Sequence, residues 1–372
     1  MNGTSPRFLR IIPLIIVVLT ALASPAFSED INIQTLIKNA EGGDPEAQSK
    51  LGLAYGKGEG VPKDDVEAVK WFRKAAEQGL ASAQSNLGLA FFAGQGVQQD
   101  YAEGVKWFRK AAEQGHSESQ FLLGMAYNQG MGVPQDHAEA AKWYRKAAEQ
   151  ELMLAQYNLG NAYDKGKGVP QDHAEAAKWY RKAAEQGFVA AQYQIGLAYA
   201  NGRGISQDHT EAMKWFRKAA EQGHAKSQFV LGLAYGSGLG VTKDEAEAVM
   251  WFRKAAEQGD ADGQFLLGGL FDEGTGVQQD HAEAVRWYHK AAEQGHADAQ
   301  KNLGVSYYKG EGVQQDYVLA YFWTSLSVSR SKGEKYNSNV RARDTASKKL
   351  TPEQLEKAQQ MIQEWEAKHP RK

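Results

Sequence analysis

The side chains that most often perform chemistry in proteins are either missing from this 372-residue chain or repeated along it at a fixed interval. There is no cysteine, which excludes disulfides, thiolate nucleophiles and thiolate metal ligands. Four histidines share a spacing of 36 residues or twice that: His137, His173, His209 and His281. Equivalent side chains of neighbouring packed helices lie roughly 10 Å apart, whereas a zinc ligand lies about 2.1 Å from its metal. We therefore expect solvated histidines, no metal site and no cofactor.

Tryptophan follows the same interval over most of the chain. Eight residues mark it: Trp71, Trp107, Trp143, Trp179, Trp215, Trp251, Trp287 and Trp323. Such a ladder could act as an aromatic cage for a ligand, but most of these tryptophans stand beside the alanines of a nearly verbatim KWFRKAAEQG segment, which places them in the core. No nucleophile stands in a distinctive arrangement with a base. The sequence therefore predicts no catalytic residue and a protein that is not an enzyme.

The fixed interval predicts a repeat protein in which each 36-residue unit is a helix–turn–helix. In the first copy, Asp44 caps a helix that Gly58 ends. Asp64 then opens a second helix, and Glu67 three residues later predicts an acidic variant of the capping box. Apolar stripes give each helix one buried face: Ala47, Leu51, Ala54 and Tyr55 on the first, and Ala68, Trp71, Phe72 and Ala75 on the second.

The pattern A-Q-x-x-L-G-x-x-Y-x-x-G-x-G-V-x-x-D-x-x-E-A-x-K-W-F-R-K-A-A-E-Q-G, as in residues 47–79, resembles the Sel1-like repeat family, which is related to the tetratricopeptide repeats. Eight copies follow it: 44–79, 80–115, 116–151, 152–187, 188–223, 224–259, 260–295 and 296–331. The resemblance implies an all-α, right-handed α/α superhelical solenoid whose first helices line a concave face. It also implies adaptor or scaffold roles in complex assembly, in signalling, or in contacts between bacteria and hosts.

The two ends of the chain differ from the repeats. Residues 29–43 align with the second half of a copy, which predicts an N-terminal capping helix. In the eighth copy, residues 321–326 replace the usual charged sequence with a largely apolar one, and that surface needs a cover. The C-terminal capping region, 332–372, supplies it with a shorter helix within 333–349 and a lid helix over 351–368, which begins at a capping box.

Residues 1–28 are typical of a secretory signal peptide. Arg7 and Arg10 precede an apolar stretch, 11–23, and small residues permit cleavage near Ser28. A retained anchor is the alternative, although the apolar stretch is shorter than the roughly 20 residues of a membrane span. We expect cleavage, no stable membrane span afterwards, and a periplasmic or secreted bacterial protein. The formal net charge of −2 provides no basic excess for a nucleic-acid partner.

The copies differ most at first-helix positions that should face the concavity. Leu, Met, Val, Asn and Gln, rather than Lys and Glu, are typical of a peptide-accepting groove. The candidates are Leu89, Leu122, Met125, Asn158, Asn161, Gln194, Leu197, Asn201, Val230 and Leu233, with Lys50, Leu53 and Asn86 at the same positions of the first two copies. The alternative, which the sequence leaves open, is that the next repeat partly buries them.

One turn also departs from the pattern. Glu151 stands where the other copies have glycine, and a non-glycine residue is strained in the left-handed conformation. We therefore predict that this turn extends a helix instead. The apolar residues Leu152 and Met153 follow it and either pack locally or form a patch for a partner, as do Phe188 and Val189 one copy later.

The sequence favours an exported, non-enzymatic scaffold that binds a protein or peptide partner on its concave face. The alternative is a cell-wall-directed enzyme or a binder of small ligands such as peptidoglycan fragments or β-lactams. Neither the partner nor the oligomeric state follows from the repeat consensus, because consensus residues encode the fold.

Overall fold

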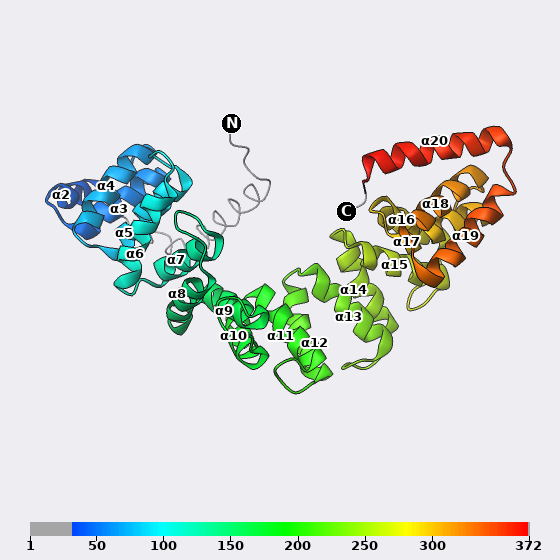
Figure 1. Ribbon diagram of the computed structural model, residues 1–372, viewed down its shortest axis with the longest axis horizontal. Coiled ribbons are helices and arrows are strands. Elements are labelled where there is room, and N and C mark those ends of the chain that lie inside the picture. The colour runs from blue at the N-terminus through cyan, green and yellow to red at the C-terminus, as the bar shows by residue number, and fades with distance from the viewer. Residues whose placement is uncertain (1–31, 371–372) are drawn as a thin grey trace. The chain divides into compact units, whose positions relative to one another are not determined.

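This computed structural model describes residues 32–370. Helices joined by short turns and loops make up the whole of this range. Nineteen helices follow one another along that range (Figure 1). They fall into two compact units, the N-terminal unit of residues 32–186 and the C-terminal unit of residues 187–370. No helix of the described range is both long enough and apolar enough to cross a membrane. The expected signal peptide, 1–28, lies outside the described residues.

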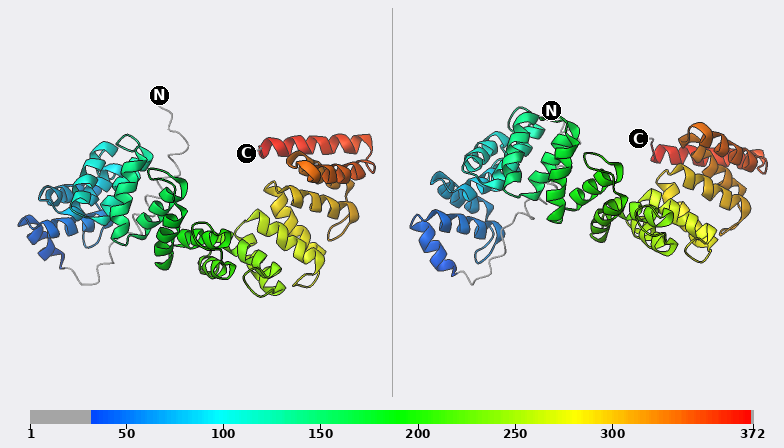
Figure 2. Two further views of the ribbon diagram at one scale, coloured as in Figure 1. Left: turned by 60° about the horizontal axis from the view of Figure 1, so that its bottom comes forward. Right: turned by 90° about the horizontal axis from the view of Figure 1, so that it is seen from below.

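Each repeat contributes a first and a second helix. The first helices are α3 Pro45–Lys57, α5 Ala81–Ala93, α7 Ser117–Gln129, α9 Met153–Lys165, α11 Val189–Asn201, α13 Ala225–Ser237, α15 Ala261–Glu273 and α17 Ala297–Lys309. The second helices are α4 Asp65–Glu77, α6 Tyr101–Glu113, α8 His137–Glu149, α10 His173–Glu185, α12 His209–Glu221, α14 Glu245–Glu257, α16 His281–Glu293 and α18 Tyr317–Arg330. Within each unit, every helix of these pairs contacts the next one along the chain (Figure 2). The predicted all-helical solenoid of eight helix pairs is confirmed.

Aspartate caps start all eight second helices. Asp64 Oδ1 accepts the N–H groups of Val66 and Glu67, each at 3.0 Å, which satisfies amides that have no partner within the helix. Glu67 does not complete a capping box. Its carboxylate binds Lys70 at 2.7 Å, because the Asp64 N–H already donates to the Tyr55 carbonyl. The capping-box prediction is therefore wrong in its second half.

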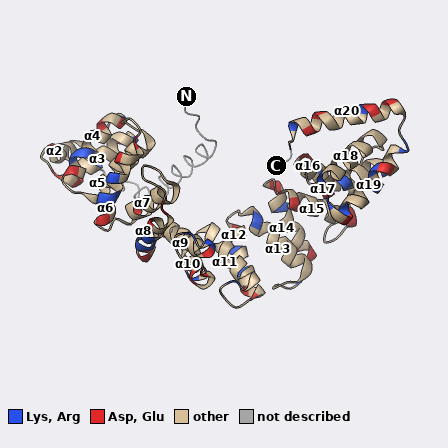
Figure 3. Ribbon diagram, in the orientation of Figure 1, with Lys and Arg blue, Asp and Glu red and all other residues tan. Residues whose placement is uncertain are grey.

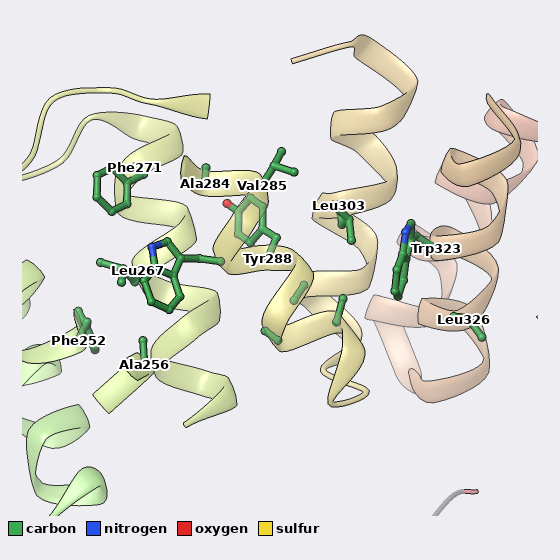
Figure 4. Close-up of a cluster of buried hydrophobic side chains, with 14 of the residues drawn as sticks. Phe252, Ala256, Leu267, Phe271, Ala284, Val285, Tyr288, Leu303, Trp323 and Leu326 are labelled. Atoms are coloured by element: carbon green, nitrogen blue, oxygen red, sulfur yellow. The ribbon is translucent and has the colours of Figure 1, made fainter. Parts of the chain in front are cut away.

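The eight tryptophans lie in the core, each at most 8% exposed. Trp251 of α14 shares a cluster with Phe216 of α12 and Leu231 of α13, so it joins its own repeat to the preceding one. Figure 4 shows the corresponding cluster of the last repeats, where Leu303 lies between Tyr288 and Trp323. Replacing such a tryptophan by alanine is expected to destabilise the repeat by about 3–5 kcal/mol.

Glycines permit two close approaches in most of the repeats. A Cβ on Gly124 of α7 would lie 2.7 Å from the Tyr144 ring of α8, so glycine lets the two helices of a pair meet. A Cβ on Gly132, in the loop after α7, would lie 2.3 Å from the Tyr101 carbonyl oxygen of the repeat before. These contacts fix how each pair closes and how its loop lies on the preceding pair.

A pair of glutamines, one buried and one nearer the surface, also joins repeat to repeat. Gln228 of α13 donates through Nε2 to the Ala220 carbonyl, near the end of α12, at 3.0 Å. Its Oε1 accepts Nε2 of Gln258, which follows α14, at 2.6 Å. The same bonds recur for Gln48 and Gln78, Gln84 and Gln114, Gln120 and Gln150, Gln156 and Gln186, and Gln264 and Gln294. These pairs connect carbonyls at a helix end to both helices of the following repeat.

The turn at Glu151 keeps the shape that glycine has elsewhere. Helix α8 ends at Glu149, and Glu151 adopts a left-handed φ of 65°. Its carbonyl accepts Gln186 Nε2 at 2.9 Å, as the Gly259 carbonyl accepts Gln294 Nε2. The prediction that this turn extends a helix is therefore wrong, because the contacts around the turn hold a non-glycine residue in a strained conformation.

Helices cover both ends of the repeat array. At the start, α2 (Ile33–Glu41) is capped by Asn32, and its Leu36 lies in one cluster with Leu51 and Trp71. At the end, α19 (Gly333–Ser347) contacts α17 and α18, and α20 (Pro352–Lys368) contacts α18. Trp365 of α20 is buried in the cluster that contains Trp323 and Leu326. The predicted capping helices are confirmed, including the lid over the apolar last repeat.

Candidate functional site

The ten variable residues predicted to contact a partner define what we call the first-helix face. The structure does not treat them alike. Asn201 and Leu233 are exposed, Leu122 and Met125 are buried, and six are half-buried: Leu89, Asn158, Asn161, Gln194, Leu197 and Val230. Five of the ten lie in each unit, so each unit has a first-helix face of its own. The structure therefore shows exposure at some of these positions and the partial burial that the sequence left as an alternative at others, and binding of a partner at any of them stays a prediction.

Two residues of the first-helix face lie in the core. Leu122 shares a cluster with Phe108 and Trp143, and Met125 shares another with Tyr144. Their side chains are 5% and 6% exposed, so the expectation of an accessible stripe is wrong at these positions. Long apolar side chains gain more from contact with neighbouring rings than from exposure to water. Their role in binding stays a prediction, and the proposal below depends on the more accessible members.

The accessible part of the face combines apolar and amide side chains. Leu233 is 44% exposed, while Leu197 and Val230 cover the cluster beneath them. Asn158 donates to the Leu154 carbonyl at 2.8 Å, and Asn161 accepts the Tyr180 hydroxyl at 2.9 Å. Each of these amides therefore uses one polar atom within the fold. The other atom has no hydrogen-bond partner among the described residues.

The second helices present a different surface. Their exposed charges form local pairs, such as Lys142 with Glu139 and Lys214 with Glu211, and basic and acidic residues alternate along them (Figure 3). A hydrogen bond to Glu211 raises the pKa of Lys214. Exposed ion pairs of this kind contribute little stability. They solvate the outer surface of each repeat and leave no apolar patch around Lys214.

Basic side chains of the second helices also cover aromatic rings. Lys146 Nζ lies 4.1 Å from the centre of the Trp143 ring in its own helix. Arg145 lies over the Tyr163 ring of the next repeat and donates to its hydroxyl. Arg217 makes the same contact with Tyr235 in the C-terminal unit. These cations shield the edges of the core, so they are poor candidates for binding a ligand.

Three of the four histidines of the ladder are paired rather than solvated, whereas His209 Nδ1 is buried without a hydrogen-bond partner among residues 32–370. His137, His173, His209 and His281 each begin a second helix and are half-buried. His137 Nδ1 lies 3.0 Å from Asn128 Oδ1, and His281 Nδ1 lies 2.7 Å from Asp272 Oδ1. The expectation of solvation is therefore wrong for His137, His173 and His281, because the loop returns each of them to the end of the first helix, and His209 is half-buried as well. Within residues 32–370, no three His, Asp or Glu side chains are grouped to hold a metal.

Three further histidines, His116, His224 and His296, cap first helices. His116 Nδ1 accepts the Ser119 N–H, and His224 Nδ1 accepts the Ser227 N–H, both at 3.3 Å. A ring nitrogen can accept this bond only when it carries no proton. Burial lowers the pKa of His116 and of His224; the Glu118 carboxylate partly opposes the shift at His116, while Lys226 adds to it at His224. These two caps therefore require neutral imidazole.

A cavity that the sequence did not predict lies at the end of the array. It occupies about 200 Å³ between α17, α18 and α19, and its lining includes Tyr308, Thr324 and Arg341. Thr324 stands at the position that is Phe or Tyr in the other seven repeats. That departure in the eighth copy is the only sequence signal that could have indicated the cavity.

The helix pairs and the periodic glycines and tryptophans define a class of protein, the α-solenoid of short helical repeats. Comparison with family models gives the particular family. The Sel1 repeat matches eight times, at residues 45–80, 81–116, 117–152, 154–188, 189–224, 225–260, 261–296 and 297–330. The chain belongs to the Sel1 repeat family. Repeats of this family generally mediate protein–protein interaction.

Two solved structures resemble the chain over most of their length. One is a protective antigen of uropathogenic Escherichia coli with a Sel1-like repeat fold, at 35% identity and a TM-score of 0.64 over 90% of this chain and 86% of that one. The other is a Sel1 repeat protein from Oxalobacter formigenes, at 34% identity and a TM-score of 0.64 over 84% of this chain and 91% of that one. The comparison with curated proteins gives no match.

Proposed function

We propose that this chain is an exported, non-enzymatic scaffold whose first-helix face binds a protein or peptide partner. The observation that carries the proposal is the contrast between two surfaces. The accessible first-helix face presents leucine, valine and amide side chains without paired charges, whereas the second helices present locally paired ions. Apolar contact area supplies affinity, and amides satisfy the backbone groups of a bound peptide.

Export is the second part of the proposal. It is supported by the positively charged start, the apolar stretch and the small residues of 1–28. It is also supported by the E. coli relative, which is a protective antigen, because such antigens are reached from outside the cell. Cleavage near Ser28 would release the scaffold into the periplasm or the medium.

The test is partner capture from an envelope extract by the purified chain and two double variants. Leu233→Glu with Asn201→Glu places two carboxylates on exposed positions of α13 and α11, where a partner would bury them without a counter-charge. Lys214→Gln with Arg286→Gln alters the net charge equally on the second helices, at side chains 65% and 75% exposed. We expect the first variant to lose a stoichiometric partner and the second to keep it.

The opposite pattern would contradict the assignment of the binding face. Turnover of a peptidoglycan fragment without any protein partner would favour the cell-wall enzyme instead. Unfolding midpoints of both variants should match that of the original chain, since all four side chains are accessible.

A further inference from the structure

Seven of the eight repeats place an aromatic ring against the same glycine. The first helix contributes the glycine and the second helix contributes the ring, and a Cβ on the glycine would lie 2.6–2.8 Å from ring carbons. The pairs are Gly52 and Phe72, Gly88 and Phe108, Gly124 and Tyr144, Gly160 and Tyr180, Gly196 and Phe216, Gly232 and Phe252, and Gly268 and Tyr288. The local backbone is therefore built to hold one aromatic ring.

The eighth repeat keeps the glycine and lacks the ring. Gly304 of α17 faces Thr324 of α18, whose methyl carbon would lie 2.6 Å from a Cβ on the glycine. The Thr324 hydroxyl is satisfied within α18, since it donates to the Ala320 carbonyl at 2.7 Å. The smaller side chain leaves the cavity of about 200 Å³, with Val305 and Tyr308 on one wall and Ala346 of α19 on another.

The size and the lining of this cavity suit one aromatic ring. An apolar protein cavity of about 150 Å³ is large enough to bind benzene. Thr324 and Ala346 are buried, whereas Arg341 and Thr345 are exposed at the rim, so the cavity opens to solvent beside α19. A ligand can enter without unfolding of the capping helices.

Arg341 supplies the only charge of the cavity lining. Its guanidinium makes no ion pair or hydrogen bond within residues 32–370. The neighbouring carboxylate, Asp344, is engaged by Arg343 through two hydrogen bonds of 2.9 and 2.7 Å. An arginine free of protein partners at the mouth of an apolar cavity is suited to a planar carboxylate, which it can bind through two parallel hydrogen bonds.

We propose that this cavity binds the C-terminal residue of a peptide when that residue is Phe or Tyr. The ring of the ligand takes the place that the repeat's own ring has in the other seven copies, and Arg341 holds the terminal carboxylate. The inference extends the proposed function, on which it rests, by naming the end of the peptide that the last repeat recognises. It does not depend on which residues of the first-helix face contact the remainder of a partner.

The test measures binding of a fluorescein-labelled hexapeptide of five alanines followed by phenylalanine, by fluorescence polarisation with the full chain. Amidation of its C-terminus should weaken binding roughly ten- to hundred-fold, because a hydrogen-bonded charge is lost. Replacement of the last residue by alanine should abolish measurable binding. N-acetylphenylalanine, used as the competitor, should displace the peptide only at higher concentration, because it lacks the chain. Displacement at equal affinity would overturn the assignment to a peptide terminus.

Two variants test separately whether the cavity holds the aromatic ring and whether Arg341 binds the terminal carboxylate. Thr324→Phe restores the residue type of the other repeats, so the chain should fold and the peptide should no longer bind. Arg341→Gln leaves the cavity intact and should make the free acid and the amide bind equally. Unchanged selectivity in Arg341→Gln, or unchanged affinity in a folded Thr324→Phe, would overturn the proposal. If both variants still capture the partner through the first-helix face, the proposed function stands without this site.

Discussion

Replacing Glu151 by glycine should stabilise the turn between α8 and α9. Glu151 is the only non-glycine residue with a positive φ among the described residues, and six of the other seven copies have glycine at the equivalent position. The Glu151 side chain makes no ion pair or hydrogen bond within residues 32–370, and its carbonyl bond from Gln186 belongs to the backbone. The substitution therefore changes the backbone preference and nothing else of consequence.

The magnitude follows from two opposing terms. A left-handed conformation costs a non-glycine residue roughly 1–2 kcal/mol. Replacing Glu151 by glycine removes this cost, but glycine also gives the unfolded chain more conformational freedom, which offsets about 0.5–1 kcal/mol of the stabilisation. We expect a net stabilisation of about 0.5–1 kcal/mol for Glu151→Gly. The reverse change, Gly259→Glu, should destabilise its turn by a similar amount, since nothing lies within 4 Å of a Cβ at Gly259 to add a clash.

Hydrogen exchange followed by mass spectrometry is the appropriate assay, because a solenoid opens locally and each repeat depends on its neighbours. Amides of α8 and α9 should exchange about two- to five-fold more slowly in Glu151→Gly. Amides of α14 and α15 should exchange faster by a similar factor in Gly259→Glu. Faster exchange around α8 in Glu151→Gly would refute the assignment of strain to this turn.

Three further changes test other parts of the structure. Gln228→Met should destabilise the C-terminal unit by about 1–3 kcal/mol in urea unfolding, because it leaves the Ala220 carbonyl and the Gln258 amide without their hydrogen-bond partner. No loss of stability would show that the glutamine pairs are dispensable. His116 binds a proton less readily in the folded chain than in the unfolded chain, so lowering the pH from about 6.5 should destabilise the N-terminal unit. His116→Asn should reduce this pH dependence of stability. Equal pH profiles for the variant and the original chain would contradict the neutral cap. Deleting 351–372 should expose Trp323 and accelerate exchange in α18, whereas unchanged exchange would contradict the lid.

Much of the fold follows from the sequence because its signals repeat. One tryptophan or one capping aspartate would be ambiguous, but eight of each at one spacing fix the helix pairs and their buried faces. The turn at Glu151 could not be predicted from local preference, because neighbouring contacts hold it in an unfavourable conformation. The glutamine bonds could not be assigned either, since Gln228 and Gln258 are 30 residues apart and meet only when the two helices of their repeat pack together, while Gln228 reaches the Ala220 carbonyl of the preceding repeat only when the repeats stack.

The candidate site was harder to predict than the fold. Helical periodicity indicates which side of a first helix faces away from its own repeat, but it does not reveal what reaches across from a neighbour. Met125 and Leu233 are both apolar and stand at the same position of their repeats, yet the former is buried and the latter 44% exposed. The cavity beside Thr324 depends on how α19 lies over the last pair, which no repeat pattern encodes.

The central claim is that the first-helix face meets a protein partner outside the cytoplasm. The most direct measurement places a photo-crosslinking phenylalanine analogue at position 233, or at position 214 as a control, in the full-length chain expressed in its own cells. The account predicts an ultraviolet-dependent adduct of one discrete mass from position 233, recovered in the envelope or secreted fraction, and none from position 214. Adducts from position 214 alone, or adducts confined to the cytoplasmic fraction, would contradict it.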